Sequence, residues 1–459
     1  MTIVAPLAIC WIGAALVMLG DGRRARVAWG AVAVLAAALI ATLVIAADVA
    51  QGGARTMVAG DWAPGVGIVL RVDALGSLFA AVSLTVILAA VATEALRGVR
   101  DRFFPALALF LATGLCGIFL TADIFNFYVF FEISMIAAYV LVAYGQQRPQ
   151  FRAATLFAVV NLLGSTLFLI GVAAIYHLTG RLDMATIAAR AADPSSAMAL
   201  LPATLLFVAF GVKLGFFPFH FWLATVYTGA RPAVAAMLAG ALANIGGYGL
   251  IRFGGEVLPR ELAAAAPALL ALGAASVIYG GVQAISRSTM AETLAYSAIG
   301  QAGYILVALA IGGERGLAAA ALFAAINALN KGALFLGADL RGRAATVVMA
   351  IAALSVAGVP PVAGFFGKAS LLQAATAADR PFVVALIVLG GFLSLLYLLL
   401  AFQRDHHAPR PADEAVARAW PRRWAALAMA GLLLAIGIWP QPLLALAQTA
   451  AAALVGGAP

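Results

Sequence analysis

Residues 210–222 read Phe-Gly-Val-Lys-Leu-Gly-Phe-Phe-Pro-Phe-His-Phe-Trp, so a charge, a glycine and a proline interrupt a long apolar stretch. Gly215 and Pro218 follow shortly after Lys213. Glycine loosens a helix and proline removes a backbone hydrogen-bond donor, so we expect unwound backbone beside the charge. The stretch therefore predicts a helix that is broken next to a lysine.

A second stretch, 358–368, reads Gly-Val-Pro-Pro-Val-Ala-Gly-Phe-Phe-Gly-Lys and predicts the same break at Pro360 and Pro361, before Lys368. Interrupted helices in two corresponding positions are typical of the inverted repeats of transporters. We therefore predict two five-helix repeats, 104–253 and 261–402, each with its fourth helix broken. Five crossings are an odd number, so the second repeat would be inverted relative to the first.

The composition predicts an all-α protein that crosses a membrane many times, because 64% of the residues are hydrophobic, 10% are charged and the mean hydropathy is +1.05. At about 20 apolar residues per crossing, we expect about fourteen transmembrane helices, with broken helices in spans 7 and 12. Residues 1–103 would hold spans 1–3 and a hairpin, and residues 403–459 a loop and span 14. A short surface helix is expected within 183–198. The predicted spans begin near Thr2, Val27, Asp73, Phe104, Phe125, Ala153, Leu200, Ala233, Glu261, Glu292, Leu317, Ala344, Pro381 and Trp424.

The positive charge is carried mostly by arginine, and 17 of the 25 arginines fall in the loops that follow odd-numbered spans. Basic loops face the cytoplasm, so both termini are predicted on the periplasmic side of a bacterial inner membrane. The loop in 403–423, with the largest share of these arginines, is interpreted as a solvated cytoplasmic connection. Arginines scattered through short loops favour this interpretation over nucleic-acid binding, which we do not expect.

The lysines are only three, Lys213, Lys331 and Lys368, and each lies within an apolar stretch. Lysine can give up its proton when it is desolvated, whereas arginine effectively cannot. Span 5 adds Glu132, an acid near mid-membrane whose isolated burial would cost several kcal/mol. An ionisable residue inside a span indicates a functional site. We therefore predict proton translocation by these four residues, with Glu132 paired to Lys213.

Polar side chains near the lysines are candidate proton relays. Each of them taken alone could instead stabilise helix contacts, and His220 could instead cap the broken segment. Waters bound by such groups could carry a proton between the charges. No cofactor-binding or metal-binding residues are predicted. The candidate relays are His220, Asn244, Ser297, Gln301, Asn327 and Asn330.

The chain resembles the antiporter-like subunits of Mrp-type cation/proton antiporters, respiratory complex I and membrane-bound hydrogenases. The resemblance rests on five stretches in the family's order, and the hairpin in 60–69 is most similar to the D-type member of the Mrp subunits. The five stretches are 123–132 (Asp-Ile-Phe-Asn-Phe-Tyr-Val-Phe-Phe-Glu), 210–222, 294–300 (Leu-Ala-Tyr-Ser-Ala-Ile-Gly), 330–335 and 358–368.

The resemblance implies a fourteen-helix fold with inverted repeats, in which Glu132 and Lys213 form a coupling pair. Lys331 would then be the central relay and Lys368 would lie at the exit half-channel. Such subunits work in a row within a larger complex and hold no redox centre of their own. The expected partners are therefore the other subunits of an antiporter or respiratory complex, the lipid bilayer and protons, with Na⁺ as the candidate second ion.

Four departures from the family pattern bear on the proton path. Asn244 stands in span 8 where relatives carry a lysine, and Asn327 where a histidine is common. The loop 222–227 lacks the family's proline and acid, and 290–292 replaces a basic pair. Either water bound by Asn244 spans the gap, or the chain conducts poorly. Three functions remain open: an antiporter subunit, a subunit of a complex I-like or hydrogenase machine, and a non-conducting structural subunit.

Overall fold

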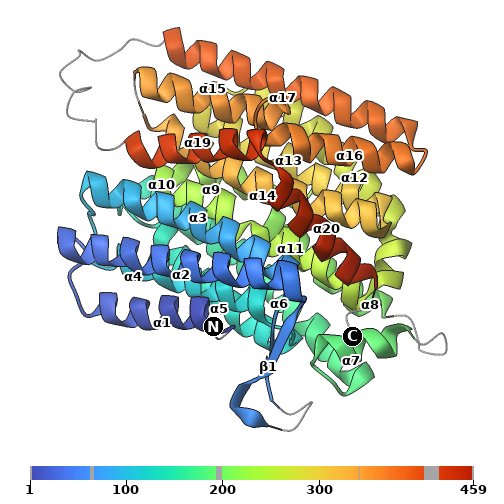
Figure 1. Cartoon of the computed structure of the whole chain (residues 1–459). Helices are drawn as coiled ribbons and strands as arrows, with labels where there is room; N and C mark the ends of the chain where they lie inside the picture. The colour runs from blue at the N-terminus through green and yellow to red at the C-terminus, as the bar shows by residue number, and fades with distance from the viewer. Residues whose placement is uncertain (1–2, 63–66, 193–198, 341, 408–422, 457–459) are drawn as a thin grey trace.

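The structure is a computed structural model that describes residues 3–62, 67–192, 199–340, 342–407 and 423–456. Its helices lie side by side as a bundle (Figure 1). The first helices are α1 (Ala5–Met18), α2 (Ala25–Gly52), α3 (Ala74–Arg97), α4 (Phe104–Leu120), α5 (Ile124–Val142), α6 (Arg148–Thr179) and α7 (Met184–Ala192). A short 3₁₀ turn η1 (Ala59–Asp61) lies in the hairpin between α2 and α3. Spans 7 and 8 consist of α8 (Leu200–Leu214), α9 (Leu223–Gly229), α10 (Pro232–Met237), the π-helical turn η2 (Leu238–Leu242), α11 (Asn244–Arg252) and the π-helical turn η3 (Phe253–Val257). The remaining helices are α12 (Pro259–Ile285), α13 (Met290–Ile311), α14 (Gly313–Ala338), α15 (Arg343–Ala357), α16 (Gly364–Ala377), α17 (Pro381–His407), α19 (Trp424–Ile438) and α20 (Gln441–Val455).

The helices agree with the predicted spans one by one. In the part of the chain that the structure describes, nine helices or continuous helical runs are long and apolar enough to cross a membrane. The remaining predicted spans are occupied by shorter apolar helices, two of which continue after a break, and by the bent pair α19 and α20. The predicted surface helix is α7. The boundaries of the two predicted repeats stay a prediction, and most of the predicted loop in 403–423 lies outside the described residues.

Both predicted helix breaks are present. Gly215 ends α8 with a φ of +71°, and Gly358 ends α15 with a φ of +84°. Glycine adopts this left-handed conformation without the steric cost that a side chain adds. Proline then delays the next helix, which starts at Leu223 in the first break and at Gly364 in the second. The fourth helix of each predicted repeat is therefore interrupted.

Two further irregularities were not predicted. Span 8 contains the π-helical turns η2 and η3, and such turns occur frequently at functional sites. Span 14 is bent by 75° between Ile438 and Gln441. Pro440 lies at this bend, and a residue that precedes a proline is disfavoured in the helical conformation. Pro440 therefore divides the last span into two helices. Length and hydropathy alone predict a single helix here.

The hairpin between α2 and α3 is confirmed as an antiparallel pair, β1 (Arg55–Val58) with β2 (Val69–Val72). It projects downward in Figure 1 from the right-hand end of the helices, where α7 also lies. The start of α1 and the end of α20 lie at this same end, as an even number of spans requires.

A buried cluster of four charges joins β2 to span 8 at the hairpin end. Arg252 on α11 lies 2.7 Å from Asp73 and 2.7 Å from Glu256, and Arg71 lies 2.6 Å from Glu256. Asp73 also caps α3 by accepting a hydrogen bond from the Gly76 amide at 2.8 Å. Two cations and two carboxylates balance, so the cluster holds the hairpin against span 8 with no net charge.

The centre of the bundle is α14, which is in contact with helices from both halves of the chain, including α3, α10, α13, α16 and α20. Most of its side chains are buried. The helix that carries Lys331 is therefore surrounded by protein rather than by lipid.

Close backbone contact at the second break provides a stability prediction. A Cβ at Gly364 would overlap the carbonyl oxygen of Ser355. We expect Gly364→Ala to lower the free energy of unfolding by about 1–3 kcal/mol, because overpacking forces the backbone to shift. Thermal unfolding of the purified protein in detergent measures this. Gly431→Ala on α19 is the matched control, since its Cβ would meet nothing within 4 Å. Equal unfolding midpoints for the two variants would contradict the prediction.

Candidate functional site: a row of buried lysines

Lys213 lies in the last turn of α8, immediately before the break. Its side chain is buried and the residue is 5% exposed. The ammonium donates a hydrogen bond to the backbone carbonyl of Asn161 on α6 at 3.3 Å, and it lies 4.0 Å from the centre of the Phe131 ring. A carbonyl dipole and an aromatic face both attract a cation. The break thus leaves the lysine held by neutral groups.

Glu132 follows Phe131 on α5 and is a neighbour of this lysine. The two side chains form no direct ion pair among the described residues, where the Lys213 ammonium contacts the Asn161 carbonyl and the Phe131 ring. The Glu132 Oε1 atom is buried and has no hydrogen-bond partner there. The pairing of Glu132 with Lys213 stays a prediction, because the Lys213 ammonium is directed at the Asn161 carbonyl and the Phe131 ring.

Lys331 lies in the second half of α14 and is 1% exposed. Its ammonium donates a hydrogen bond to the Ser297 hydroxyl on α13 at 2.8 Å. The Ser297 hydroxyl in turn lies 2.8 Å from the hydroxyl of Tyr397 on α17. Two of the predicted relay residues are in this neighbourhood, since the Gln301 amide also reaches the Tyr397 hydroxyl at 3.4 Å.

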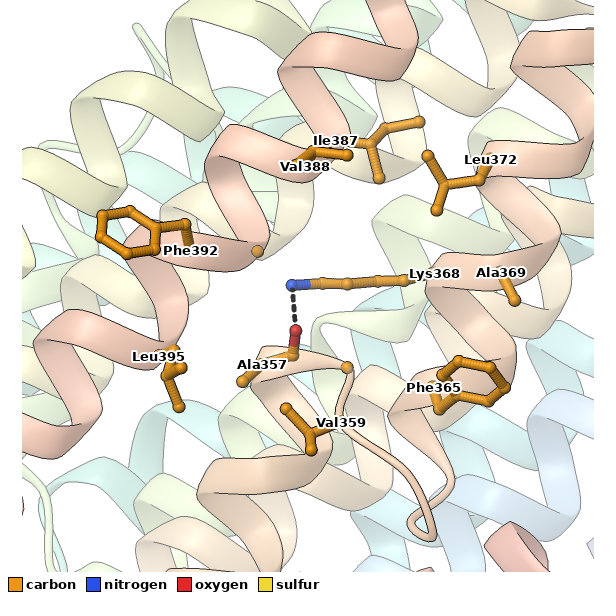
Figure 2. A pocket seen from close by; sticks show the side chains of 12 residues that line it. Ala357, Val359, Phe365, Lys368, Ala369, Leu372, Ile387, Val388, Phe392 and Leu395 are labelled. Carbon is orange, nitrogen blue, oxygen red and sulfur yellow. Dashed lines mark hydrogen bonds between the residues drawn. The ribbon is translucent and has the colours of Figure 1, made fainter.

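Lys368 is on α16, just after the second break, and is 6% exposed. Its ammonium donates a hydrogen bond at 3.0 Å to the carbonyl of Ala357, the last residue of α15. Figure 2 shows the side chain extending into a cavity between these helices and α17, with Val388 and Phe392 on the far wall. The cavity has a volume of about 350 Å³ and apolar walls. Lys368 and Lys213 therefore each donate a hydrogen bond to a backbone carbonyl. The carbonyl bound by Lys368 lies at the helix break, and the one bound by Lys213 lies within α6.

Asn244 is placed by the π-helical turn η2. Its amide donates hydrogen bonds to the Ser83 hydroxyl on α3 at 3.0 Å and to the Gly240 carbonyl at 3.2 Å. Gly240 allows close approach to α14, because a Cβ there would lie 2.6 Å from the Ala328 carbonyl oxygen. Asn244 is therefore near the helix of Lys331, without a direct hydrogen bond to that lysine among the described residues.

Each of the other three predicted relays has a buried polar atom without a hydrogen-bond partner in the described part of the chain. His220 lies in the first break and its ring packs 4.7 Å from that of Tyr279, with a buried Nδ1 atom that has no hydrogen-bond partner in the described part of the chain. The Oδ1 atoms of Asn327 and Asn330 on α14 are also buried without a partner there. These three residues stay candidates for relay, since water bound by their free polar atoms could connect them to a lysine.

Four residues around the charges were not identified from sequence. They are buried polar residues inside apolar spans, and that property was the signal available. Their partners come from helices distant in sequence, which only the packing reveals. The four residues are Ser83, Asn161, Ser394 and Tyr397.

The arrangement suits proton exchange. Each of the three ammonium groups donates to a neutral oxygen, and among the described residues none is in direct contact with a carboxylate. Buried charges are usually paired, so an unpaired row is costly to keep. An unpaired lysine can release and regain a proton, whereas arginine cannot.

The chain is similar to known membrane proteins over most of its length. Residues 121–394 match the family described as NADH:quinone oxidoreductase/Mrp antiporter, transmembrane. The chain is 30% identical over 392 residues to the D-type subunit of the Na⁺/H⁺ antiporter of Alkalihalophilus pseudofirmus, covering 79% of this chain and 78% of the relative. It is also 30% identical over 417 residues to the N-type subunit of the NADH-quinone oxidoreductase of Desulforudis audaxviator, covering 82% of each.

A solved structure gives the same result. A chain in the structure of the Mrp complex from Dietzia sp. DQ12-45-1b superimposes with a TM-score of 0.89 at 27% identity, covering 99% of this chain and 98% of that one. The expected resemblance and the fold class are thereby confirmed.

Proposed function

Since this chain belongs to the NADH:quinone oxidoreductase/Mrp antiporter transmembrane family, we propose that it conducts protons along Glu132, Lys213, Lys331 and Lys368. It does so as a subunit of a multisubunit monovalent cation/proton antiporter. The observation that carries the proposal is the row of lysines, 5%, 1% and 6% exposed, each of which donates to a neutral oxygen and to no carboxylate in the described part of the chain. A protein that needed fixed positive charge in these places could use arginine, which keeps its proton.

The two broken helices support the same function. Lys213 and Lys368 each lie beside a break. At the second break the Ala357 carbonyl is free of the helix ladder and accepts a hydrogen bond from Lys368, whereas Lys213 donates to the Asn161 carbonyl of α6. Glu132 adjusts the proton affinity of Lys213 through its charge, without occupying the lysine's hydrogen bonds. A change in the distance between them therefore changes how readily Lys213 exchanges its proton.

The membrane and its orientation complete the proposal. The chain is a multi-pass membrane subunit of a bacterial antiporter family, and we assign it to the bacterial inner membrane. The end that carries the hairpin faces the periplasm, because most arginines lie in the loops at the opposite end. Cysteine labelling of Thr56→Cys in β1 from outside intact spheroplasts tests this, and labelling only after permeabilisation would contradict it.

A second assignment has its own support. The similarity to the N-type oxidoreductase subunit extends over as much of the chain as the similarity to the antiporter subunit. In that assembly, proton transfer through the same residues would follow electron transfer in other subunits. Native mass spectrometry of the purified complex separates the two, because small antiporter subunits or redox subunits would accompany the chain.

Flux measurements test the proposed function itself. We expect Lys213→Ala and Glu132→Ala each to lower cation-dependent proton flux in membrane vesicles at least about tenfold, because each removes a group that binds the proton or tunes its binding. Arg23→Ala is the control, since Arg23 pairs with Asp21 at the exposed surface. Unchanged flux in both test variants, with normal assembly, would favour a non-conducting structural subunit instead.

A further inference from the structure

Two helices of the second half of the chain, α13 and α17, are in contact along two matching stripes of residues, all polar except one glycine. On each helix three residues recur at helical spacing, so they lie on one face. The stripe on α13 consists of Ser297, Gln301 and Tyr304, and that on α17 of Gly390, Ser394 and Tyr397.

The two stripes meet pairwise. The Ser297 hydroxyl lies 2.8 Å from the Tyr397 hydroxyl, and the Gln301 amide donates to the Ser394 hydroxyl at 3.2 Å. In the third pair, a Cβ at Gly390 would overlap the Tyr304 hydroxyl. The residue number rises along α13 as it falls along α17, as expected for antiparallel helices. We call these three pairs the α13/α17 ladder.

A lysine lies at each end of the α13/α17 ladder. Lys331 donates its hydrogen bond to Ser297 in the first pair. Lys368 lies 5.3 Å from the centre of the Tyr304 ring in the third pair, and its Nζ atom is 3.4 Å from the place that a Cβ on Gly391 would take. The pairs span seven residues of helix, about 10 Å. The ladder therefore lies between the two lysines in the protein interior. Its hydrogen bonds extend from Lys331 to Ser394, and the Tyr304 hydroxyl has no hydrogen-bond partner among the described residues.

The side chains of the ladder can carry a proton. A hydroxyl both donates and accepts hydrogen bonds, so it can take a proton on its oxygen as it releases its own. The amide of Gln301 instead orients the others, since it also donates to the Tyr397 hydroxyl at 3.4 Å. Both hydroxyls of the first pair are buried, and a low dielectric strengthens such a chain.

We propose that the α13/α17 ladder carries protons from Lys331 to Lys368, and that Ser297 and Tyr397 transfer the proton in its first step. The proposal rests on the proposed function and deepens it. The Lys331 ammonium gives a proton to Ser297 as the Ser297 proton passes to Tyr397 and the phenolic proton of Tyr397 moves on. Water among the polar groups covers the remaining distance, and the neutral Lys368 amine gains the proton that Lys331 lost.

The test uses the complete complex in vesicles with Tyr397→Phe and Ser297→Ala, which remove one oxygen each. We expect proton flux to fall at least about tenfold in each variant. We also expect the ratio of flux in H₂O to flux in D₂O to rise, because proton transfer becomes rate-limiting. Tyr296→Phe, next to Ser297 but directed at Arg287 outside the ladder, is the matched control with unchanged flux.

The alternative is that these hydrogen bonds only hold α13 against α17. In that case the thermal unfolding midpoint falls, while the flux per assembled complex and the isotope ratio stay as in the wild type, and the ladder is refuted. Lys213→Ala, measured in parallel, separates this from failure of the proposed function. Lost flux in Lys213→Ala with full flux in Tyr397→Phe overturns the ladder alone, and full flux in both overturns the two together.

Discussion

Replacing Lys331 by arginine is expected to reduce proton flux to the level of vesicles without the complex. The arginine keeps a positive charge at this position of α14 but cannot release a proton at accessible pH. Lys331 is the most deeply buried of the three lysines and lies between Lys213 and Lys368 in the proposed path. The measurement is cation-dependent proton flux in vesicles, normalised to the amount of assembled complex.

The comparison with Lys331→Ala makes this result specific. If Lys331 only supplied a charge for packing, arginine would rescue the loss caused by alanine. If it exchanges protons, the two variants fail alike. Arg315→Lys, an exposed change at the start of the same helix, is the matched control and should keep full flux. Flux near the wild-type level in Lys331→Arg would end the role of Lys331 as a proton carrier.

Features caused by residues that are adjacent in the chain were predicted from the sequence, whereas features caused by packing between distant helices were not. The breaks at Gly215 and Gly358 were predicted because the residues that cause them are next to each other in the chain. The capping of α5 by Asp123, which accepts from the Asn126 amide at 2.7 Å, is similarly local. Long apolar stretches likewise gave the spans directly.

The partners of the charges were less accessible. The Ser297 neighbour of Lys331 was predicted from its polarity, whereas Tyr397 was not, because that contact depends on how α13 packs on α17. The π-helical turn η2, which places Asn244 against Ser83, also results from packing around Gly240 rather than from a local signal. Sequence therefore identified the charges and the helix breaks, and the packing supplied the groups that hold the charges.

The second large effect is expected at the buried charge cluster of the hairpin end. Arg252→Met leaves Asp73 and Glu256 with Arg71 as their remaining partner in the cluster. Removing one partner from a buried ionic network strands an uncompensated charge, and this costs about 3–5 kcal/mol of the free energy of unfolding. Thermal or denaturant unfolding of the purified protein in lipid nanodiscs measures the loss.

Two further variants test whether the loss of stability comes from the buried cluster and from its charge balance. Arg55→Met breaks the exposed ion pair between Arg55 and Asp48 in the same hairpin region, and such pairs contribute about 0–1 kcal/mol. Combining Arg252→Met with Glu256→Gln removes one charge of each sign and should recover part of the stability, because fewer charges are then left unbalanced. Equal stability of Arg252→Met and Arg55→Met would contradict the prediction that the buried cluster holds the hairpin against span 8. Recovery in the double variant would instead show that charge balance, and not the packing of the arginine side chain, determines the stability of this end of the bundle.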